Sequence, residues 1–260
     1  MMRAPFIPAL LAALVLSAAL SGCATPPPAD DPDAVAEFKQ TNDPLEPTNR
    51  VMYAVNDALD TVILRPVAIA YRDVVPAPVR QHTRNVLDNL ANPVVLANDM
   101  MQGKPRRAGD TLMRFLLNST LGVAGIFDVA TDWGWPAHDS DFGITLASWG
   151  AGEGPFLFLP ILGPSNPRDA VGYGADIALD PFTWVGAGST VEALGYSRYA
   201  VTAVDARAGA LDDLDKIKSQ ALDPYATFRS LFRQYRANKV KTALSDDRAT
   251  PPNWQSQPRR

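Results

Sequence analysis

The run Phe156 to Leu162 constrains the fold more strongly than any other stretch of this 260-residue chain. Six of its seven residues are large and apolar, and Gly154-Pro155 and Gly163-Pro164 enclose it. A surface loop is normally polar, so a run this apolar belongs in a core, against a partner protein or in lipid. Pro160 and the flanking glycines also disfavour a regular helix. The residues alone leave the three environments open.

We predict that this run forms a non-helical apolar hairpin. The candidate lipid-path or membrane-contact residues are Phe156, Leu157, Phe158, Leu159, Pro160, Ile161 and Leu162. The turn residues that frame the hairpin are Gly150, Gly152, Gly154, Pro155, Gly163 and Pro164. Whether the run lines a lipid path or only lies in a leaflet is not decided by the sequence.

Composition restricts the fold and the partners. The 23 prolines are spread along the chain, which predicts many short helices with abrupt ends. A hydrophobic fraction of 47% with 20% charged residues is typical of a globular domain with a sizeable core. The net charge of −4 argues against nucleic acid as the main partner, because nucleic-acid-binding domains carry a basic footprint.

The first 22 residues are typical of a secretion signal. Arg3 precedes an apolar segment over residues 9–20, which is too short to span a bilayer. Leu20-Ser21-Gly22-Cys23 is similar to the lipobox of bacterial lipoproteins, which implies acylation of Cys23 after cleavage. Cys23 is the only cysteine, so no intramolecular disulfide can form. By the same resemblance, the absence of Asp after Cys23 implies a lipid-anchored protein on the periplasmic face of the outer membrane.

The remaining chain predicts a flexible, extended tether over 23–41, one all-α domain over 42–243, and a disordered tail over 244–260. Helices are expected up to about Asp60, with a stop at Arg65-Pro66, and from Pro78, with a stop or kink at Asn92-Pro93. Another should begin at Pro105. A long helix is predicted over 191–220 and a last one from Pro224, each with an apolar face.

Two further side-chain sets allow alternative interpretations. Trp133, Trp135, Trp149 and Trp184 suit a membrane interface, but tryptophans are equally common in cores. The last helix carries a basic stripe that could meet anionic headgroups or an acidic partner, or could simply be solvated. Its members are Arg229, Arg233, Arg236 and Lys239.

No catalytic or metal-binding motif stands out, so we expect neither an enzyme nor a cofactor. His82 and His138 lie far apart, without a second histidine at the spacing of a zinc site. There is no nucleophile elbow and no phosphate loop. Asp141-Phe142-Gly143 spells the kinase tripeptide without the other kinase motifs. A Ser-His-Asp arrangement depends on spatial proximity, so a hydrolase stays a minor alternative.

Specific motifs support a family resemblance over about Asn42 to Pro181. Those that carry it include Asn42-Asp43-Pro44-Leu45-Glu46-Pro47, Arg65-Pro66-Val67-Ala68, Arg114-Phe115-x-x-Asn118, Asp141-Phe142-Gly143-x-Thr145-Leu146, Trp149-Gly150-x-Gly152-x-Gly154-Pro155 and Arg168-Asp169. With these residues the chain resembles the MlaA/VacJ family of outer-membrane lipoproteins.

The resemblance implies a ring of short helices embedded in the inner leaflet of the outer membrane, beside a trimeric porin. It further implies that phospholipids mislocalised to the outer leaflet leave through an amphipathic channel and pass to a soluble periplasmic lipid carrier. A structural envelope lipoprotein that acts as a scaffold is the main alternative. A scaffold should tolerate a charge in the 156–162 run, whereas a lipid path should not.

Overall fold

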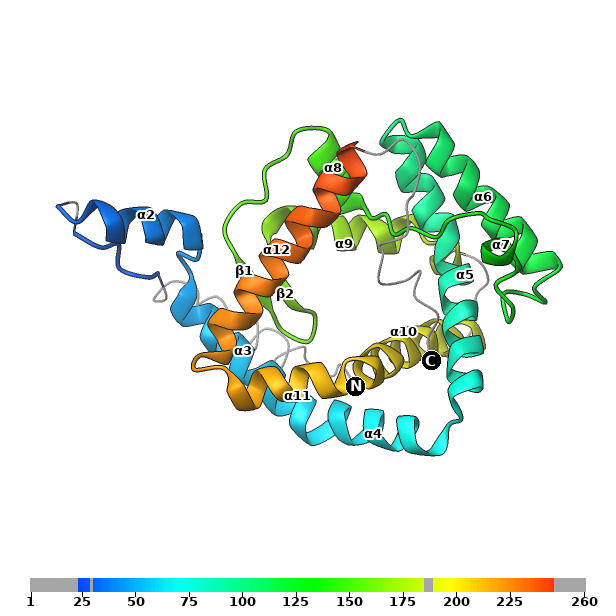
Figure 1. Ribbon diagram of the computed structural model, residues 1–260, viewed down its shortest axis with the longest axis horizontal. Coiled ribbons are helices and arrows are strands. Elements are labelled where there is room, and N and C mark those ends of the chain that lie inside the picture. Colours follow the sequence, from blue (N-terminus) through cyan, green and yellow to red (C-terminus); the bar gives the residue numbers. More distant parts are fainter. Residues whose placement is uncertain (1–22, 29, 185–188, 246–260) are drawn as a thin grey trace, which may run out of the picture.

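In a computed structural model, residues 23–28, 30–184 and 189–245 are described. Helices dominate these residues, and they are arranged as a ring (Figure 1). The predicted all-α class is confirmed, with one two-stranded antiparallel sheet inside it. In the order of the chain the elements are α2 (Pro32–Thr41), α3 (Glu46–Leu59), η1 (Asp60–Leu64), α4 (Arg65–Val74), α5 (Ala77–Met101), α6 (Pro105–Thr120), α7 (Val129–Asp132), α8 (Phe142–Ser148), β1 (Leu157–Leu159), β2 (Gly163–Ser165), α9 (Pro167–Leu179), η2 (Pro181–Thr183), α10 (Ser189–Gly209), α11 (Leu211–Gln220) and α12 (Pro224–Ser245).

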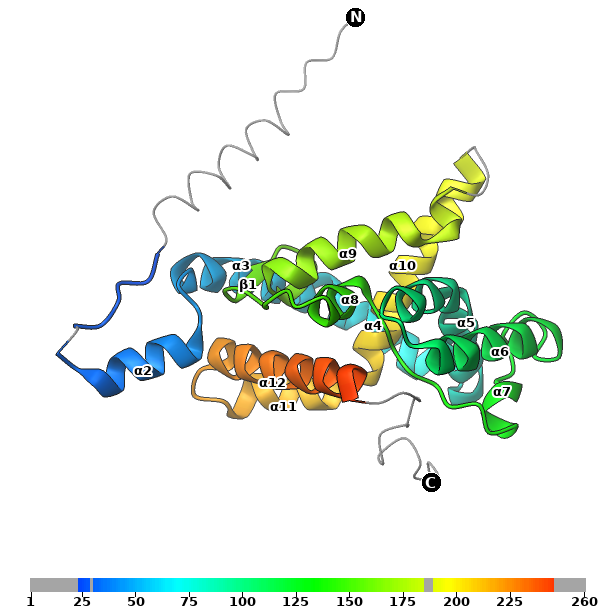
Figure 2. The same cartoon turned by 90° about the horizontal axis from the view of Figure 1, so that it is seen from above.

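The ring is closed by elements that are distant in sequence. α3 and α4 run along its lower side in Figure 1, α5 and α6 form the right side, and α8 and α9 lie at the top. The hairpin β1–β2 and α12 complete the left side. Seen from above, α11 and α12 form a second layer beside the layer of α3, the hairpin and α9 (Figure 2).

The predicted stop at Arg65-Pro66 is wrong, because helical backbone continues from α3 through η1 into α4. η1 is a π-helix in which the amide N of Arg65 bonds to the carbonyl O of Asp60, five residues earlier. Proline lacks an N–H and clashes with the carbonyl four residues before it. The wider π turn accommodates Pro66 where an α-helical turn would break.

The stop at Asn92-Pro93, one of the two alternatives expected from the sequence, is also wrong. α5 runs through Pro93 for 25 residues. Pro93 costs this helix one backbone hydrogen bond. The packing of α5 against α6, the most extensive helix contact among the described residues, offsets that loss. The long helix predicted over 191–220 is likewise divided, at Ala210, into α10 and α11.

The starts of several helices follow the sequence prediction. Pro78 and Pro105 lie in the first turns of α5 and α6, where the missing N–H costs nothing. α12 begins at Pro224 as expected, and Asp223 caps it by accepting a hydrogen bond from the amide N of Ala226 at 3.1 Å. Of the disordered tail predicted over 244–260, Leu244 and Ser245 belong to α12, and the rest lies outside the described residues.

The tether is not extended throughout. Pro32–Thr41 form α2, which Asp31 caps by accepting a hydrogen bond from the amide N of Ala34 at 3.0 Å. The amide N of Ala24 donates to the carbonyl O of Pro44 at 2.6 Å. The segment between them is therefore a closed loop, and Cys23 lies beside the start of α3. α2 projects away from the ring (Figures 1 and 2).

Burial is inverted relative to an ordinary soluble domain. Among the described residues, 18 polar or charged residues are buried but only 10 hydrophobic ones, and five of those ten are alanines. Many large apolar side chains are exposed instead, for example Val62 at 73% and Val74 at 78%. Soluble domains bury such side chains and rarely expose them in quantity. No helix among the described residues is long and apolar enough to span a membrane.

Candidate functional site

The apolar run forms the hairpin that the sequence predicts. β1 and β2 pair antiparallel, with Leu157 opposite Ser165 and Leu159 opposite Gly163. Ile161 in the connecting turn has φ 70°, and Gly163 at the start of β2 has φ 83°. Glycine adopts this left-handed backbone without strain, whereas a β-branched residue rarely does. The turn therefore presents isoleucine at a position where local backbone preference favours glycine or asparagine.

Two asparagines of α3 hold the hairpin as a neighbouring strand would. Asn49 accepts from the amide N of Phe158 at 2.8 Å and donates to the carbonyl O of Phe156 at 3.0 Å. Further along α3, Asn56 donates to the carbonyl O of Leu159 at 2.7 Å and accepts from the amide N of Ile161 at 2.6 Å. The outer edge of β1 is thus satisfied by side chains spaced seven residues apart on one helix face.

The entry to the hairpin is held by the residue that ends α2. Asn42 has a left-handed backbone at φ 51°. Its side chain donates to the carbonyl O of Gly154 at 2.7 Å, and its carbonyl O accepts from the amide N of Phe156 at 2.8 Å. Among the predicted frame residues, Gly150 and Gly154 have φ of 94° and 72°, so glycine is favoured at both.

The hairpin divides the predicted contact residues into two groups. Phe156 and Phe158 are only 2% and 7% exposed, within an aromatic cluster. The ring of Tyr53 lies 5.5 Å from that of Phe158, and Tyr225 lies 6.2 Å from Phe156, both edge to face. For these two phenylalanines, the core interpretation holds. They are not available for contact with lipid.

The tip of the hairpin is the part that remains accessible. Ile161 is 83% exposed and Leu162 is 52% exposed, and Pro160 is also exposed. Leu157, Leu159, Pro155 and Pro164 are half-buried. A lipid-contact role, if the hairpin has one, therefore falls on the turn from Pro160 to Leu162.

Three of the four tryptophans named above point outward. Trp133, Trp149 and Trp184 are 59% to 72% exposed, and Trp135 is half-buried. Two of the exposed indoles donate to backbone: Trp149 Nε1 to the carbonyl O of Met101 at 3.2 Å, and Trp184 Nε1 to that of Ala178 at 2.8 Å. The core interpretation is wrong for the three exposed residues. An exposed ring with an internally bonded N–H suits a membrane interface.

The basic stripe of α12 faces the protein itself, which overturns all three interpretations offered above. Each of its cations pairs with a carboxylate on a distant segment. The N–O distances are 2.7 Å for Arg229–Asp43, 2.7 Å for Arg233–Glu153, 2.6 Å for Arg236–Asp141 and 2.9 Å for Lys239–Asp139. Sequence reasoning missed this role because the matching acids are spread from Asp43 to Asp169.

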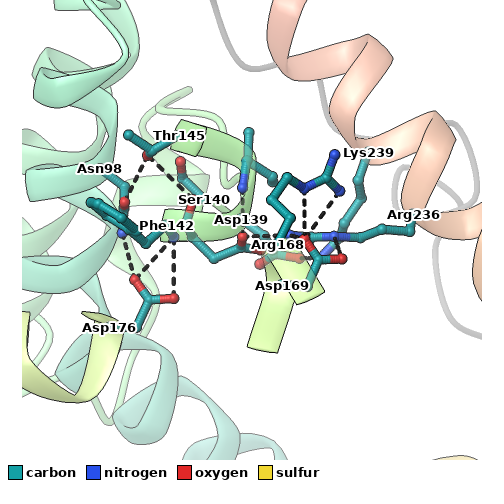
Figure 3. Close-up of polar contacts among 12 residues, drawn as sticks. Asn98, Asp139, Ser140, Phe142, Thr145, Arg168, Asp169, Asp176, Arg236 and Lys239 are labelled. Carbon is teal, nitrogen blue, oxygen red and sulfur yellow. Dashed lines mark hydrogen bonds and ion pairs between the residues drawn. The ribbon is translucent and has the colours of Figure 1, made fainter. Parts of the chain in front are cut away.

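Arg236 lies at the centre of the tightest of these contacts (Figure 3). It donates two hydrogen bonds to Asp141 and two to Asp169, at 2.6 to 2.9 Å, while being only 8% exposed. Burial alone would raise the pKa of Asp169, but the hydrogen bonds and charges of Arg236 and Arg168 outweigh it and lower that pKa. The cluster joins α12 to the starts of α8 and α9.

The helices α8 and α9 cross next to this cluster through two glycines. A Cβ on Gly172 would lie 2.4 Å from the amide N of Gly143. A Cβ on Gly143 would lie 2.5 Å from Arg236 Nη2 and from Asp169 Oδ1. The tripeptide Asp141-Phe142-Gly143 thus has a packing role here. Asp141 caps α8 and binds Arg236, and Gly143 allows the close crossing.

Comparison with known proteins identifies the family. The profile of the MlaA lipoprotein family matches residues 41–239, which is most of the chain. The chain belongs to the MlaA lipoprotein family. An intermembrane phospholipid transport system lipoprotein MlaA of Haemophilus influenzae is 34% identical over 251 residues, covering 92% of this chain and 96% of the relative. The protein of the same name from Escherichia coli K12 is 36% identical over 197 residues, covering 74% and 76%.

A solved structure shares the fold of this MlaA family member. It was reported as "Structural basis for maintenance of bacterial outer membrane lipid asymmetry". The two superpose with a TM-score of 0.66 at 33% identity, over 76% of this chain and 98% of the other. The resemblance inferred from motifs between Asn42 and Pro181 is therefore confirmed.

In the described part of the chain, one histidine, His138, contacts both a carboxylate and a hydroxyl. Its geometry is not that of a catalytic relay. His138 Nε2 lies 2.7 Å from Asp99 Oδ2 and 3.3 Å from Thr111 Oγ1. A relay needs the acid and the hydroxyl on opposite ring nitrogens. Here both contact Nε2, and all three side chains are buried. The described residues contain no group of three or more potential metal ligands.

Proposed function

We propose that this protein is an outer-membrane lipoprotein that removes mislocalised phospholipids from the outer leaflet. The lipids would move through an amphipathic channel and pass to a soluble periplasmic carrier. Membership of the MlaA lipoprotein family carries this proposal, because curated relatives are named as lipoproteins of an intermembrane phospholipid transport system. This role is transport and requires no catalysis.

The inverted burial supports a position within a leaflet. Apolar side chains that water would expel are stable against acyl chains, while buried polar groups must bond to one another. α3, η1 and α4 provide one such series of exposed apolar side chains. Its members are Val51, Val55, Leu59, Val62, Ile63, Val67 and Val74.

The position of Cys23 supports the same arrangement. The bond between Ala24 and Pro44 places Cys23 beside the start of α3. Acyl chains on Cys23 would therefore enter the leaflet next to the apolar series of α3 to α4. Two or three chains together with this surface would give stable anchoring, which a single chain does not. A ring held in this way would lie in the inner leaflet, facing the periplasm.

The hairpin tip supports contact with lipid rather than with water. Ile161 has an exposed side chain on a left-handed backbone. A β-branched residue in that conformation costs about 1–2 kcal/mol relative to glycine or asparagine. In water nothing would recover this cost, whereas contact of the isoleucine with acyl chains would.

A trimeric porin is the membrane partner that we propose beside the ring.

Deletion of the gene in its own bacterium tests the proposal. Loss of the protein should raise the amount of outer-leaflet phosphatidylethanolamine that reacts with a membrane-impermeant amine label on intact cells. Re-expression should restore the normal level, and purification in mild detergent should recover a porin and phospholipid. Normal labelling in the deletion strain would refute lipid removal and favour a scaffold.

A further inference from the structure

A pocket of about 570 Å³ lies beside α12, apart from the hairpin tip. Its size falls within the range of small-molecule sites, about 300–1,000 Å³. One wall is the face of α12 formed by Ala237, Val240, Lys241 and Leu244, at helical spacings i, i+3, i+4 and i+7. Arg168, at the start of α9, and Glu153 form the opposite side. One wall is thus mainly apolar, and charged groups border it.

The charges of the pocket do not balance. Glu153 is already paired with Arg233, at 2.7 Å. Arg168 is paired with Asp169. Asp169 also binds Arg236, and Arg236 binds Asp141, so these two cations and two carboxylates form a neutral group. Lys241 forms no hydrogen bond or ion pair with any described residue, although every cation of the neighbouring stripe does. One uncompensated positive charge therefore lines the pocket.

Arg168 gives the site a prearranged donor. Its side chain is only 7% exposed and is held by two contacts to Asp169 Oδ1 at 3.0 Å. A guanidinium fixed in this way loses little conformational entropy when it binds an oxyanion. Both apolar residues of the α12 wall larger than alanine are accessible, with Leu244 48% exposed and Val240 half-buried.

We infer that this pocket binds the phosphodiester of a phospholipid between Lys241 and Arg168, with the first part of an acyl chain against Val240 and Leu244. A phosphodiester carries a single negative charge, which matches the single uncompensated positive charge. The apolar wall favours a lipid over free phosphate, because phosphate has nothing to bury there. The inference rests on the proposed transport function and gives it a second lipid contact, separate from the hairpin tip.

Binding of soluble short-chain lipid tests the assignment. The full-length acylated protein, freed of lipid and kept in amphipol, is titrated calorimetrically with dihexanoyl phosphatidylglycerol, glycerophosphoglycerol and inorganic phosphate. The Lys241→Ala variant should bind the lipid about tenfold more weakly, since a charge-assisted hydrogen bond is lost. The Ala237→Trp variant, which fills the pocket without changing charge, should lose binding. The Lys216→Ala variant, which removes an exposed lysine of α11, should bind as the wild type does.

The other possible outcomes test the pocket assignment and the transport proposal separately. Wild-type lipid affinity in both Lys241→Ala and Ala237→Trp would overturn the pocket assignment and leave the transport proposal standing. Inorganic phosphate or glycerophosphoglycerol bound as tightly as the lipid would show a phosphate site rather than a lipid site. No lipid binding by the wild type would also overturn the assignment. The transport proposal itself fails only if the deletion strain shows normal outer-leaflet labelling. Circular dichroism of each variant must match the wild type for its result to count.

Discussion

The amide N of Phe158 donates to Asn49 Oδ1 at 2.8 Å, across 109 residues of sequence. Nδ2 of the same side-chain amide donates to the carbonyl O of Phe156 and to Asp43 Oδ1, so one asparagine joins the hairpin, α3 and the segment before it. Asn49 is 3% exposed, and water cannot replace it.

Asn49→Ala should therefore lower the free energy of unfolding by about 3 kcal/mol, because several buried groups lose their hydrogen-bond partner together. Tryptophan fluorescence during urea unfolding measures the change. Asn238→Ala, at an exposed position of α12, is the matched control and should stay within about 0.5 kcal/mol of the wild type. Equal stabilities of the two variants would show that the hairpin is not held by Asn49.

Arg236 should be the most sensitive cation of the basic stripe. Arg236→Ala leaves Asp141 and Asp169 close together without their shared cation, and we expect a loss of about 3–5 kcal/mol. Arg72→Ala is the control, since the Arg72–Asp212 pair is 36% and 79% exposed and should contribute less than about 1 kcal/mol. Similar small losses in both variants would mean that the cluster is not important for stability.

Asp176 should make stability fall as pH rises. Burial raises its pKa to about 6, although hydrogen bonds from Asn98 and from the amide N of Phe142 oppose that shift. The unfolded chain ionises near its ordinary pKa of about 3.9. The folded state therefore binds more protons between about pH 4 and pH 6, and stability decreases over that interval.

Asp176→Asn removes this titration. The free energy of unfolding of the wild type, minus that of the variant, should drop by about 2 kcal/mol from pH 4 to pH 7. Urea unfolding at a series of pH values measures the difference. A difference that is constant or that rises with pH would contradict the raised pKa.

A substitution at the hairpin tip can distinguish an effect on transport from an effect on folding. Ile161→Asp should leave stability within about 0.5 kcal/mol, because the residue is exposed and aspartate tolerates a left-handed backbone better than isoleucine does. In cells it should raise outer-leaflet phospholipid, as measured by the amine label. Ile161→Leu keeps an apolar tip and should behave as the wild type.

The same experiment can be made at Leu159, which is half-buried, but Leu159→Asp risks a loss of folding that Ile161→Asp avoids. A folded, anchored Ile161→Asp variant with normal outer-leaflet composition would remove the tip from the lipid path.

Cys23→Ala tests the anchor. Without acyl chains the apolar surface of the ring is left to hold the protein, and we expect part of it to be released from outer membranes by alkaline carbonate. Quantitative blotting of pellet and supernatant measures that fraction. Full retention would show that the ring stays in the leaflet by its own surface.

Local sequence determined several elements by itself. The prolines at 78, 105 and 224 set helix starts, because each occupies a first turn where no N–H is needed. Glycine and proline around 156–162 excluded a helix and indicated a hairpin. The family motifs, which are short and local, were sufficient to indicate the family.

Only the tertiary structure decided what each of these elements faces. Pro66 and Pro93 failed to end helices because π-helical geometry and packing against α6 outweigh local preference. Side chains alternate along 156–159, so Phe156 and Phe158 point inward while the turn exposes Ile161, and no composition rule separates them. The basic stripe of α12 looked like a surface for lipid or solvent, but its carboxylate partners lie from Asp43 to Asp169. Pairing between residues that far apart depends on how the ring closes, and the sequence pattern of a single helix carries no information about that.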